Sequence, residues 1–166
     1  SDKLQAIQEA IQSITDGVRP VGRTPSPARP LNEDLINVYI SNDLHFGAYM
    51  WHEETLDRDY DLTIAEKQLD DAMNYLVENS PNTTVAIVAD LGDTTEGDNF
   101  KNATPGHGHA LDVDGRYSKV IRVAMQSMVS LVEKALRKHE IVYFINIGGN
   151  HDVVTSHAIR AFVEAW

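Results

Sequence analysis

Hydrophobic positions along the chain alternate between short continuous runs and longer stretches with helical spacing. The apolar runs at residues 35–40, 83–89 and 141–147 have the length of buried strands. The ranges 63–79, 117–138 and 153–166 carry apolar residues three and four positions apart, which is typical of amphipathic helices. Apolar strands that alternate with helices predict a parallel sheet covered by helices, and therefore an α/β fold with the order β-α-β-α-β-α.

Local signals refine several of these elements. Thr63 and Glu66 have the spacing of a capping box, which predicts the start of the helix at 63–79. Met125 and Met128 lie at helical spacing and are predicted to fill the core. The acidic run between residues 53 and 61 is predicted to be solvated surface. Three histidines without a matching partner are also predicted to lie on the surface: His52, His139 and His157.

The N-terminal part differs from the rest of the chain. Residues 2–16 have a helical apolar pattern, whereas residues 20–30 contain four prolines and predict an extended linker. We therefore divide the chain into a helix at 1–17, a proline-rich linker at 18–32 and a partial domain at 33–166. The helix is expected to belong with whatever precedes this domain.

Composition narrows the classes of function. No apolar run approaches the roughly 20 residues that cross a bilayer, and no signal-peptide pattern is present, so a cytoplasmic protein without a membrane partner is expected. The absence of cysteine excludes disulfides, zinc–thiolate sites and thiol nucleophiles. The net charge of −11 gives no general attraction for phosphate backbones, so bound cations would have to neutralise a phosphate substrate locally.

Three polar clusters follow the three predicted strands: NDLHFG at 42–47, LGD at 91–93 and GNHD at 149–152. Ligands of open parallel sheets bind beyond the carboxyl ends of the strands, so the clusters should converge there. Asp43 and His45 can point to one side, Asp93 can bridge two cations, and Asn150 offers a neutral carbonyl oxygen. These ligand types suit manganese, iron or zinc.

The order D-x-H, G-D, G-N-H-D resembles the signature of the calcineurin-like metallophosphoesterases, over roughly residues 35–155. The resemblance implies that Asp43 and His45 bind a first metal, that Asp93 bridges two metals and that Asn150 binds the second. It further implies that His151 contacts the substrate and protonates the leaving group, and that Asp152 orients His151.

The same resemblance implies a fold and an activity. The fold would be half of a four-layer α-β-β-α sandwich, and the activity would be metal-dependent phosphoester hydrolysis. Two Mn²⁺ ions are expected in the complete enzyme, with Fe or Zn as alternatives, and at most one tightly bound metal in this chain. The details look most like phage and prophage phosphoesterases related to DNA-repair exonucleases, which implies a phosphodiester substrate in DNA or RNA.

This sequence departs from the family pattern at two places where the family has residues that coordinate the metals. Glu96 stands where the family usually has Asp or His, three residues after the bridging Asp. The later His and G-H-x-H of the family do not follow within this sequence, so the chain is expected to be a truncated catalytic domain with weak activity or none. Gly106-His107-Gly108-His109 spells G-H-x-H but precedes G-N-H-D. We interpret it as part of a mobile loop at 94–115.

Other functions are compatible with the same motifs. A phosphomonoesterase or phosphoprotein phosphatase would use the same motifs, and a non-catalytic interaction module could retain an incomplete metal site. If no second sheet is present, one face of the sheet should be uncovered and drive formation of a homodimer. The pattern does not choose the face, because both are apolar; the candidate residues are Val38, Ile40, Val85, Ile87, Val142 and Phe144.

Overall fold

The computed structural model describes residue 27 and residues 31–103 and 107–166. The helix expected at 2–16 and most of the linker at 18–32 lie outside the described residues. The strands are β1 (Asn32–Ser41), β2 (Thr83–Asp90) and β3 (Ile141–Asn146). The helices are α2 (His52–Thr55), α3 (Leu62–Asn79), α4 (Tyr117–Leu136) and α5 (Thr155–Ala165).

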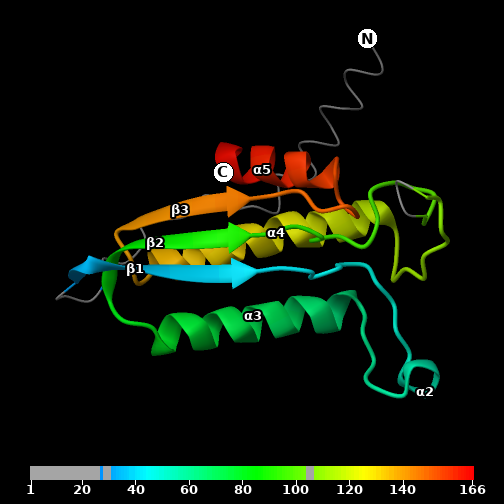
Figure 1. The fold of residues 1–166 in the computed structure, drawn as a ribbon, viewed down its shortest axis with the longest axis horizontal. Helices are drawn as coiled ribbons and strands as arrows, with labels where there is room; N and C mark the ends of the chain where they lie inside the picture. Colours follow the sequence, from blue (N-terminus) through cyan, green and yellow to red (C-terminus); the bar gives the residue numbers. More distant parts are fainter. Residues whose placement is uncertain (1–26, 28–30, 104–106) are drawn as a thin grey trace, which may run out of the picture.

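The three strands form one parallel sheet in the order β1-β2-β3, as Figure 1 shows. Apart from a register shift near the start of β1, the pairing is regular, and it aligns Ser41, Asp90 and Asn146 at the ends of the strands. The α/β class and the parallel sheet predicted from the sequence are therefore confirmed. Among the described helices, none combines the length and the apolar character that a membrane crossing requires.

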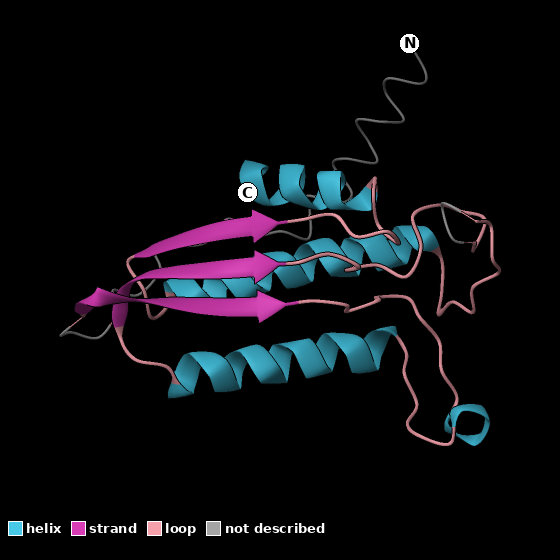
Figure 2. Ribbon diagram, viewed as in Figure 1, coloured by secondary structure: helices cyan, strands magenta, loops and turns pink. Residues whose placement is uncertain are grey.

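Helices cover one face of this sheet. In Figure 2, α4 runs behind the strands, and α3 and α5 flank it on either side. The side chains between the sheet and this layer are buried and include Tyr39 and Val88 of the strands and Met128 of α4. Met125 is also buried in the core, so the prediction for both methionines is confirmed.

The opposite face of the sheet remains apolar and exposed. Six large side chains on the outer strands are between 43 and 59% exposed: Ile36, Val38, Ile40, Ile141, Tyr143 and Ile145. The register places Val85 and Ile87 of the central strand between them. The expectation that Val142 and Phe144 are uncovered is wrong, because both pack against the helix-covered core. We call the six side chains the exposed sheet face.

The start of α3 also differs from the prediction. Asp61 is the N-cap, and its carboxylate accepts a hydrogen bond from the Ile64 amide at 2.7 Å. Thr63 lies within α3 instead of capping it, so the predicted capping box with Glu66 is not formed. The cap is Asp61, two residues earlier in the chain, and its side chain satisfies a free amide of the first turn. Asp61 also has a structural role that the prediction of a solvated acidic run did not include.

His139 is buried, with 1% of its surface exposed, so its predicted surface position is wrong. Its Nδ1 donates to the Thr83 carbonyl oxygen at 2.8 Å, and the Tyr39 hydroxyl donates to its Nε2 at 2.8 Å. These bonds join the segment that enters β3 to the start of β2 and to β1. His52 and His157 are exposed, as predicted.

Burial lowers the pKa of His139 because the charged imidazolium loses its hydration. The hydrogen bond to Thr83 opposes this effect, and the nearby positive charge of Lys138 adds to it. Folding therefore favours the neutral ring.

The free energy of unfolding should fall as the pH drops below the ordinary imidazole pKa of about 6.5, because the unfolded chain then binds a proton that folded His139 resists. His139→Phe should reduce this loss in urea unfolding curves measured above and below that pH. At neutral pH, His139→Phe should lower the free energy of unfolding by about 1–3 kcal/mol, because the buried groups that bond to His139 lose a hydrogen-bond partner. His157→Phe is the control at an exposed histidine. Equal pH dependence of the unfolding free energy in wild type and His139→Phe would show that His139 does not cause the loss of stability.

Candidate metal centre

The carboxyl ends of the three strands are joined by Asp90, which the sequence reasoning did not single out. Its buried carboxylate accepts hydrogen bonds from Thr94 Oγ1 at 2.6 Å, Asn146 Nδ2 at 2.7 Å and Ser41 Oγ at 3.4 Å. Burial raises the pKa of Asp90, although the bonds from Thr94 and Asn146 oppose the shift. The strand ends are therefore fixed relative to one another directly beneath the three polar clusters.

The first two clusters pair with each other through the backbone. The amides of Asp43, His45 and Phe46 donate to the carbonyl oxygens of residues 92, 93 and 94, at 3.1, 2.9 and 2.8 Å. The segment after β1 therefore runs along the segment after β2. This pairing sets Asp43 and His45 beside Asp93.

Two glycines allow the second and third clusters to touch. Gly92 has φ +103°, and a Cβ there would lie 2.7 Å from the Gly149 amide nitrogen. A Cβ at Gly149 would overlap the carboxylate and amide nitrogen of Asp93. Only residues without side chains fit at this contact, so both glycines are required for the approach of the two loops.

Three candidate ligands have left-handed backbone conformations. The φ angles of Asp43, His45 and Asp93 are 53°, 46° and 50°. Such conformations are costly for residues with side chains and are concentrated at functional sites. The chain therefore maintains a strained backbone at the positions that the sequence singled out.

The ligand atoms of Asp43, His45 and Asp93 all lie within 4.8 Å of one another. His45 Nε2 is 3.8 Å from Asp43 Oδ1. His151 belongs to the same cluster, because its backbone amide donates to Asp93 Oδ1 at 2.8 Å and its ring lies 4.8 Å from the ring of His45. The structure thus brings together four of the six side chains proposed from the sequence.

The other two occupy different positions. Asn150 is exposed in the turn before His151. Asp152 is fully buried, and its carboxylate accepts from the amides of Thr94 at 2.9 Å and Gly149 at 2.7 Å. Asp152 therefore ties the second cluster to the third, and the expectation that it orients the ring of His151 is wrong. The Nδ1 atom of that ring lies 2.8 Å from the backbone oxygen of Glu96.

Glu96 is the residue whose role the sequence left open. Its Oε2 lies 2.6 Å from Nδ1 of His45, and its side chain is only 16% exposed. The hydrogen bond to Glu96 is the main reason that the pKa of His45 is raised; burial opposes it, and the charges of Glu96, Asp93 and Asp43 add to it. A second possible cation-binding group consists of His45, Glu96 and His151.

The loop at 94–115 is anchored at both ends. Thr94 and Thr95 are fully buried, and the Asp98 carboxylate accepts from the amides of Val154 and Thr155 at the start of α5, each at 2.7 Å. At the far end, the Asp114 carboxylate accepts from the Leu62 amide at 3.0 Å. The interpretation of 94–115 as a mobile loop did not include these anchored ends, and residues 104–106 lie outside the described part.

The two histidines of the G-H-x-H sequence do not join the cluster. His107 and His109 are exposed, and their rings lie 5.9 Å apart. Neither belongs to the cation-binding groups found among the described residues.

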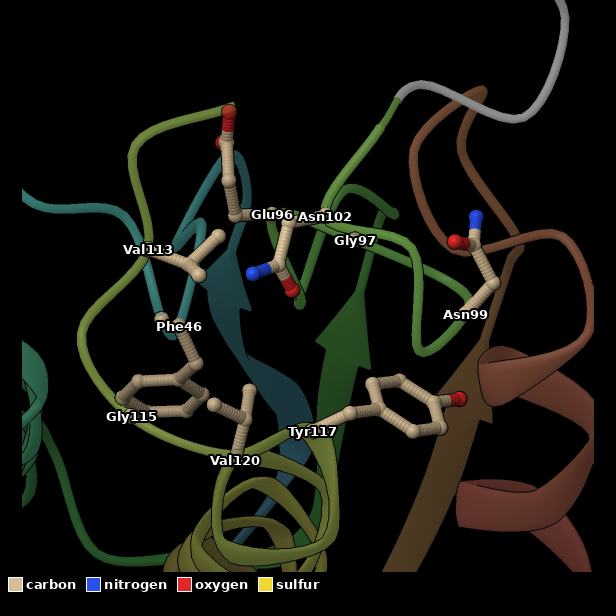
Figure 3. A pocket seen from close by; sticks show the side chains of 10 residues that line it. Phe46, Glu96, Gly97, Asn99, Asn102, Val113, Gly115, Tyr117 and Val120 are labelled. Atoms are coloured by element: carbon tan, nitrogen blue, oxygen red, sulfur yellow. The ribbon is translucent and has the colours of Figure 1, made fainter. Parts of the chain in front are cut away.

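A small pocket lies on the other side of the Glu96 segment, lined in part by Phe46, Tyr117 and Val120. Figure 3 shows that Asn102 points into it, whereas the Glu96 carboxylate points away from its apolar floor. The carboxylate instead hydrogen-bonds to His45. The pocket therefore adjoins the ligand cluster at Glu96, but Asp43, His45, Asp93 and His151 do not line it.

Comparisons of the chain with protein-family models, with curated proteins and with solved structures found no match. The residues of the cluster are therefore the basis for any functional assignment.

The donor set fits a divalent cation. Two carboxylates and one imidazole suit manganese, iron or zinc. Ligand atoms about 2.1 Å from a shared cation are roughly 3 Å apart when adjacent and 4.2 Å apart when opposite in octahedral geometry. The separations within 4.8 Å among Asp43, His45 and Asp93 approach these values, so small side-chain movements would bring the three ligand atoms to coordinating distance of one cation.

Gly149→Ala should weaken the binding of Mn²⁺ by about 10-fold or more, because the new methyl group would displace the Asp93 carboxylate. Isothermal titration calorimetry would measure the affinity. Gly97→Ala is the matched control, since a Cβ there would meet only Leu111 Cδ1 at 3.8 Å. Unchanged affinity in Gly149→Ala would show that Asp93 does not hold the cation.

Proposed function

We propose that this chain carries the catalytic site of a metal-dependent phosphoester hydrolase that acts on phosphodiesters, with DNA or RNA as the expected substrate. The supporting observation is the convergence of ligand atoms from Asp43, His45 and Asp93 within 4.8 Å, beside His151. The ordered motifs that carry these residues resemble those of calcineurin-like metallophosphoesterases, and that resemblance supplies the substrate class.

Each residue of the cluster has a chemical role in this proposal. Asp43, His45 and Asp93 would hold the cation, with Mn²⁺ expected, and Asn150 would supply a carbonyl oxygen toward a second one. When bound, such cations neutralise phosphate charge and lower the pKa of water.

His151 is placed to move a proton. Its Nδ1 donates to the Glu96 backbone oxygen at 2.8 Å, so a proton taken up at Nε2 is the one that the ring would pass to the departing oxygen. The backbone bond from His151 to Asp93 holds this ring next to the proposed cation ligands. A proton donor and an anion-neutralising centre would therefore act on the same phosphate group.

The chain should hydrolyse bis(p-nitrophenyl) phosphate slowly in the presence of Mn²⁺, and faster than p-nitrophenyl phosphate. Asp93→Asn should abolish the activity through loss of metal, whereas His151→Gln should retain Mn²⁺ and lose about 10²- to 10⁴-fold in rate. Release of p-nitrophenolate with and without EDTA provides the measurement.

Asp71→Asn is the control for a loss of negative charge, because Asp71 is exposed on α3, far along the chain from the cluster, and forms an ion pair with Lys67. Faster turnover of the monoester would favour a phosphomonoesterase or phosphoprotein phosphatase. Binding of Mn²⁺ without turnover of either ester would favour a non-catalytic interaction module.

We also propose that two copies of this chain associate through the exposed sheet face. Contiguous apolar patches of more than a few hundred Å² are uncommon on monomers, and burial gains about 25 cal/mol per Å². Because the described helices cover only the other face, two sheets packed face to face would produce the α-β-β-α layers that the family resemblance implies. The net charge of −11 disfavours unspecific aggregation.

Sedimentation equilibrium at high micromolar concentration should therefore give a dimer. Val38→Lys should shift the chain toward monomer, because Val38 lies in the middle row of the exposed sheet face, opposite Ile87. Leu56→Lys is the control, since Leu56 is an exposed apolar residue outside this face. A wild-type monomer at every concentration would contradict the proposal.

A further inference from the structure

Glu96 contacts both histidines of the cluster, through two different groups. Its side-chain Oε2 lies 2.6 Å from Nδ1 of His45, and its backbone oxygen lies 2.8 Å from Nδ1 of His151. The same Oε2 is 3.9 Å from Nδ1 of His151, beyond hydrogen-bond distance, so the backbone oxygen is the acceptor for that ring. The Glu96 amide in turn donates to the Phe46 carbonyl oxygen at 3.0 Å, which fixes Glu96 beside the segment that carries His45.

These contacts determine where the imidazole protons lie. An ionised carboxylate and a backbone carbonyl can only accept hydrogen bonds, so Nδ1 must be the donor in both rings. A neutral imidazole carries one proton, and the lone pair of each ring is then on Nε2. In His45, Nε2 is also the nitrogen that lies 3.8 Å from Asp43 Oδ1.

The alternative is that Glu96 and His45 share a cation through Oε2 and Nδ1. Ligand atoms about 2.1 Å from one cation are separated by roughly 3 Å or more. The observed 2.6 Å between Oε2 and Nδ1 is a hydrogen-bond distance and leaves no room for an ion between them. The geometry therefore favours a hydrogen bond over shared coordination.

We propose that Glu96 is a positioning residue that fixes both histidines as Nδ1–H tautomers, so that Nε2 of His45 faces the cation and Nε2 of His151 faces the substrate. The use of the two Nε2 atoms rests on the proposed function. The tautomers themselves rest only on the hydrogen bonds to Glu96.

The two contacts give the proposal an internal control. Removing the Glu96 side chain deletes the acceptor for His45 but leaves the backbone oxygen that accepts from His151. Glu96→Ala should therefore allow the ring of His45 to change its tautomer, whereas the tautomer of His151 should stay unchanged. A general disturbance of the site would instead change both rings.

Long-range ¹H–¹⁵N correlation spectra of the metal-free chain, labelled in histidine, report the tautomer of each ring. At a pH of about 9, where imidazole is normally neutral, the wild type should show Nδ1–H for both His45 and His151. Glu96→Ala should shift His45 toward the Nε2–H form that free imidazole prefers in water. Glu96→Gln, which keeps an acceptor oxygen without the charge, should restore Nδ1–H at His45.

Zn²⁺, which is diamagnetic, is the probe for the second half of the proposal. It should shift the Nε2 resonance of His45, and Glu96→Ala should lower the affinity for Zn²⁺ by about 10- to 100-fold. Glu164→Ala removes an exposed carboxylate from α5 and should leave the affinity and both tautomers unchanged.

An Nε2–H tautomer at His45 in the wild type would overturn the proposal, and this result needs no variant to fold. An unchanged His45 tautomer in Glu96→Ala would also overturn it. The expected tautomers without binding of Zn²⁺ would support the role of Glu96 in orienting the rings and would count against the proposed metal-dependent function.

Discussion

The buried carboxylate of Asp90 holds the carboxyl ends of all three strands together. It accepts from Ser41 at the end of β1, from Asn146 at the end of β3 and from Thr94 in the following loop. Burial of a carboxylate is unfavourable unless hydrogen bonds compensate for its lost hydration. Three donors from separate segments provide this compensation, so the charge and the strand ends depend on each other.

The candidate metal centre depends on this arrangement, because its backbone is strained. Left-handed residues at positions 43, 45 and 93 persist only where the surroundings hold them. Asp152 supplies a second buried carboxylate, which joins Thr94 to Gly149, and the contact between Gly92 and Gly149 brings the loops close together. The result is a cluster of donors on a constrained backbone, which the proposed cation binding and proton transfer require.

The exposed sheet face and the candidate metal centre are separate features of one sheet. Side chains at alternate positions of the strands form the face, whereas the loops beyond the strand ends form the centre. A partner could cover the face without occupying the centre. The proposed association and the proposed catalysis therefore depend on different residues and can be separated by substitution.

The sequence by itself determined the order of strands and helices, the parallel sheet and the approach of Asp43, His45 and Asp93. Local periodicity and the geometry of parallel strands are sufficient for these features. Only the tertiary structure decided that His139 is buried, that Val142 and Phe144 face the helices, that Asp61 caps α3 and that Glu96 contacts both histidines. Which side of a strand is buried, and which partner a side chain contacts, depends on residues far apart in the chain. The residue that caps a helix depends on competition between neighbouring candidates. A pattern of hydrophobic and polar positions does not record which contact prevails.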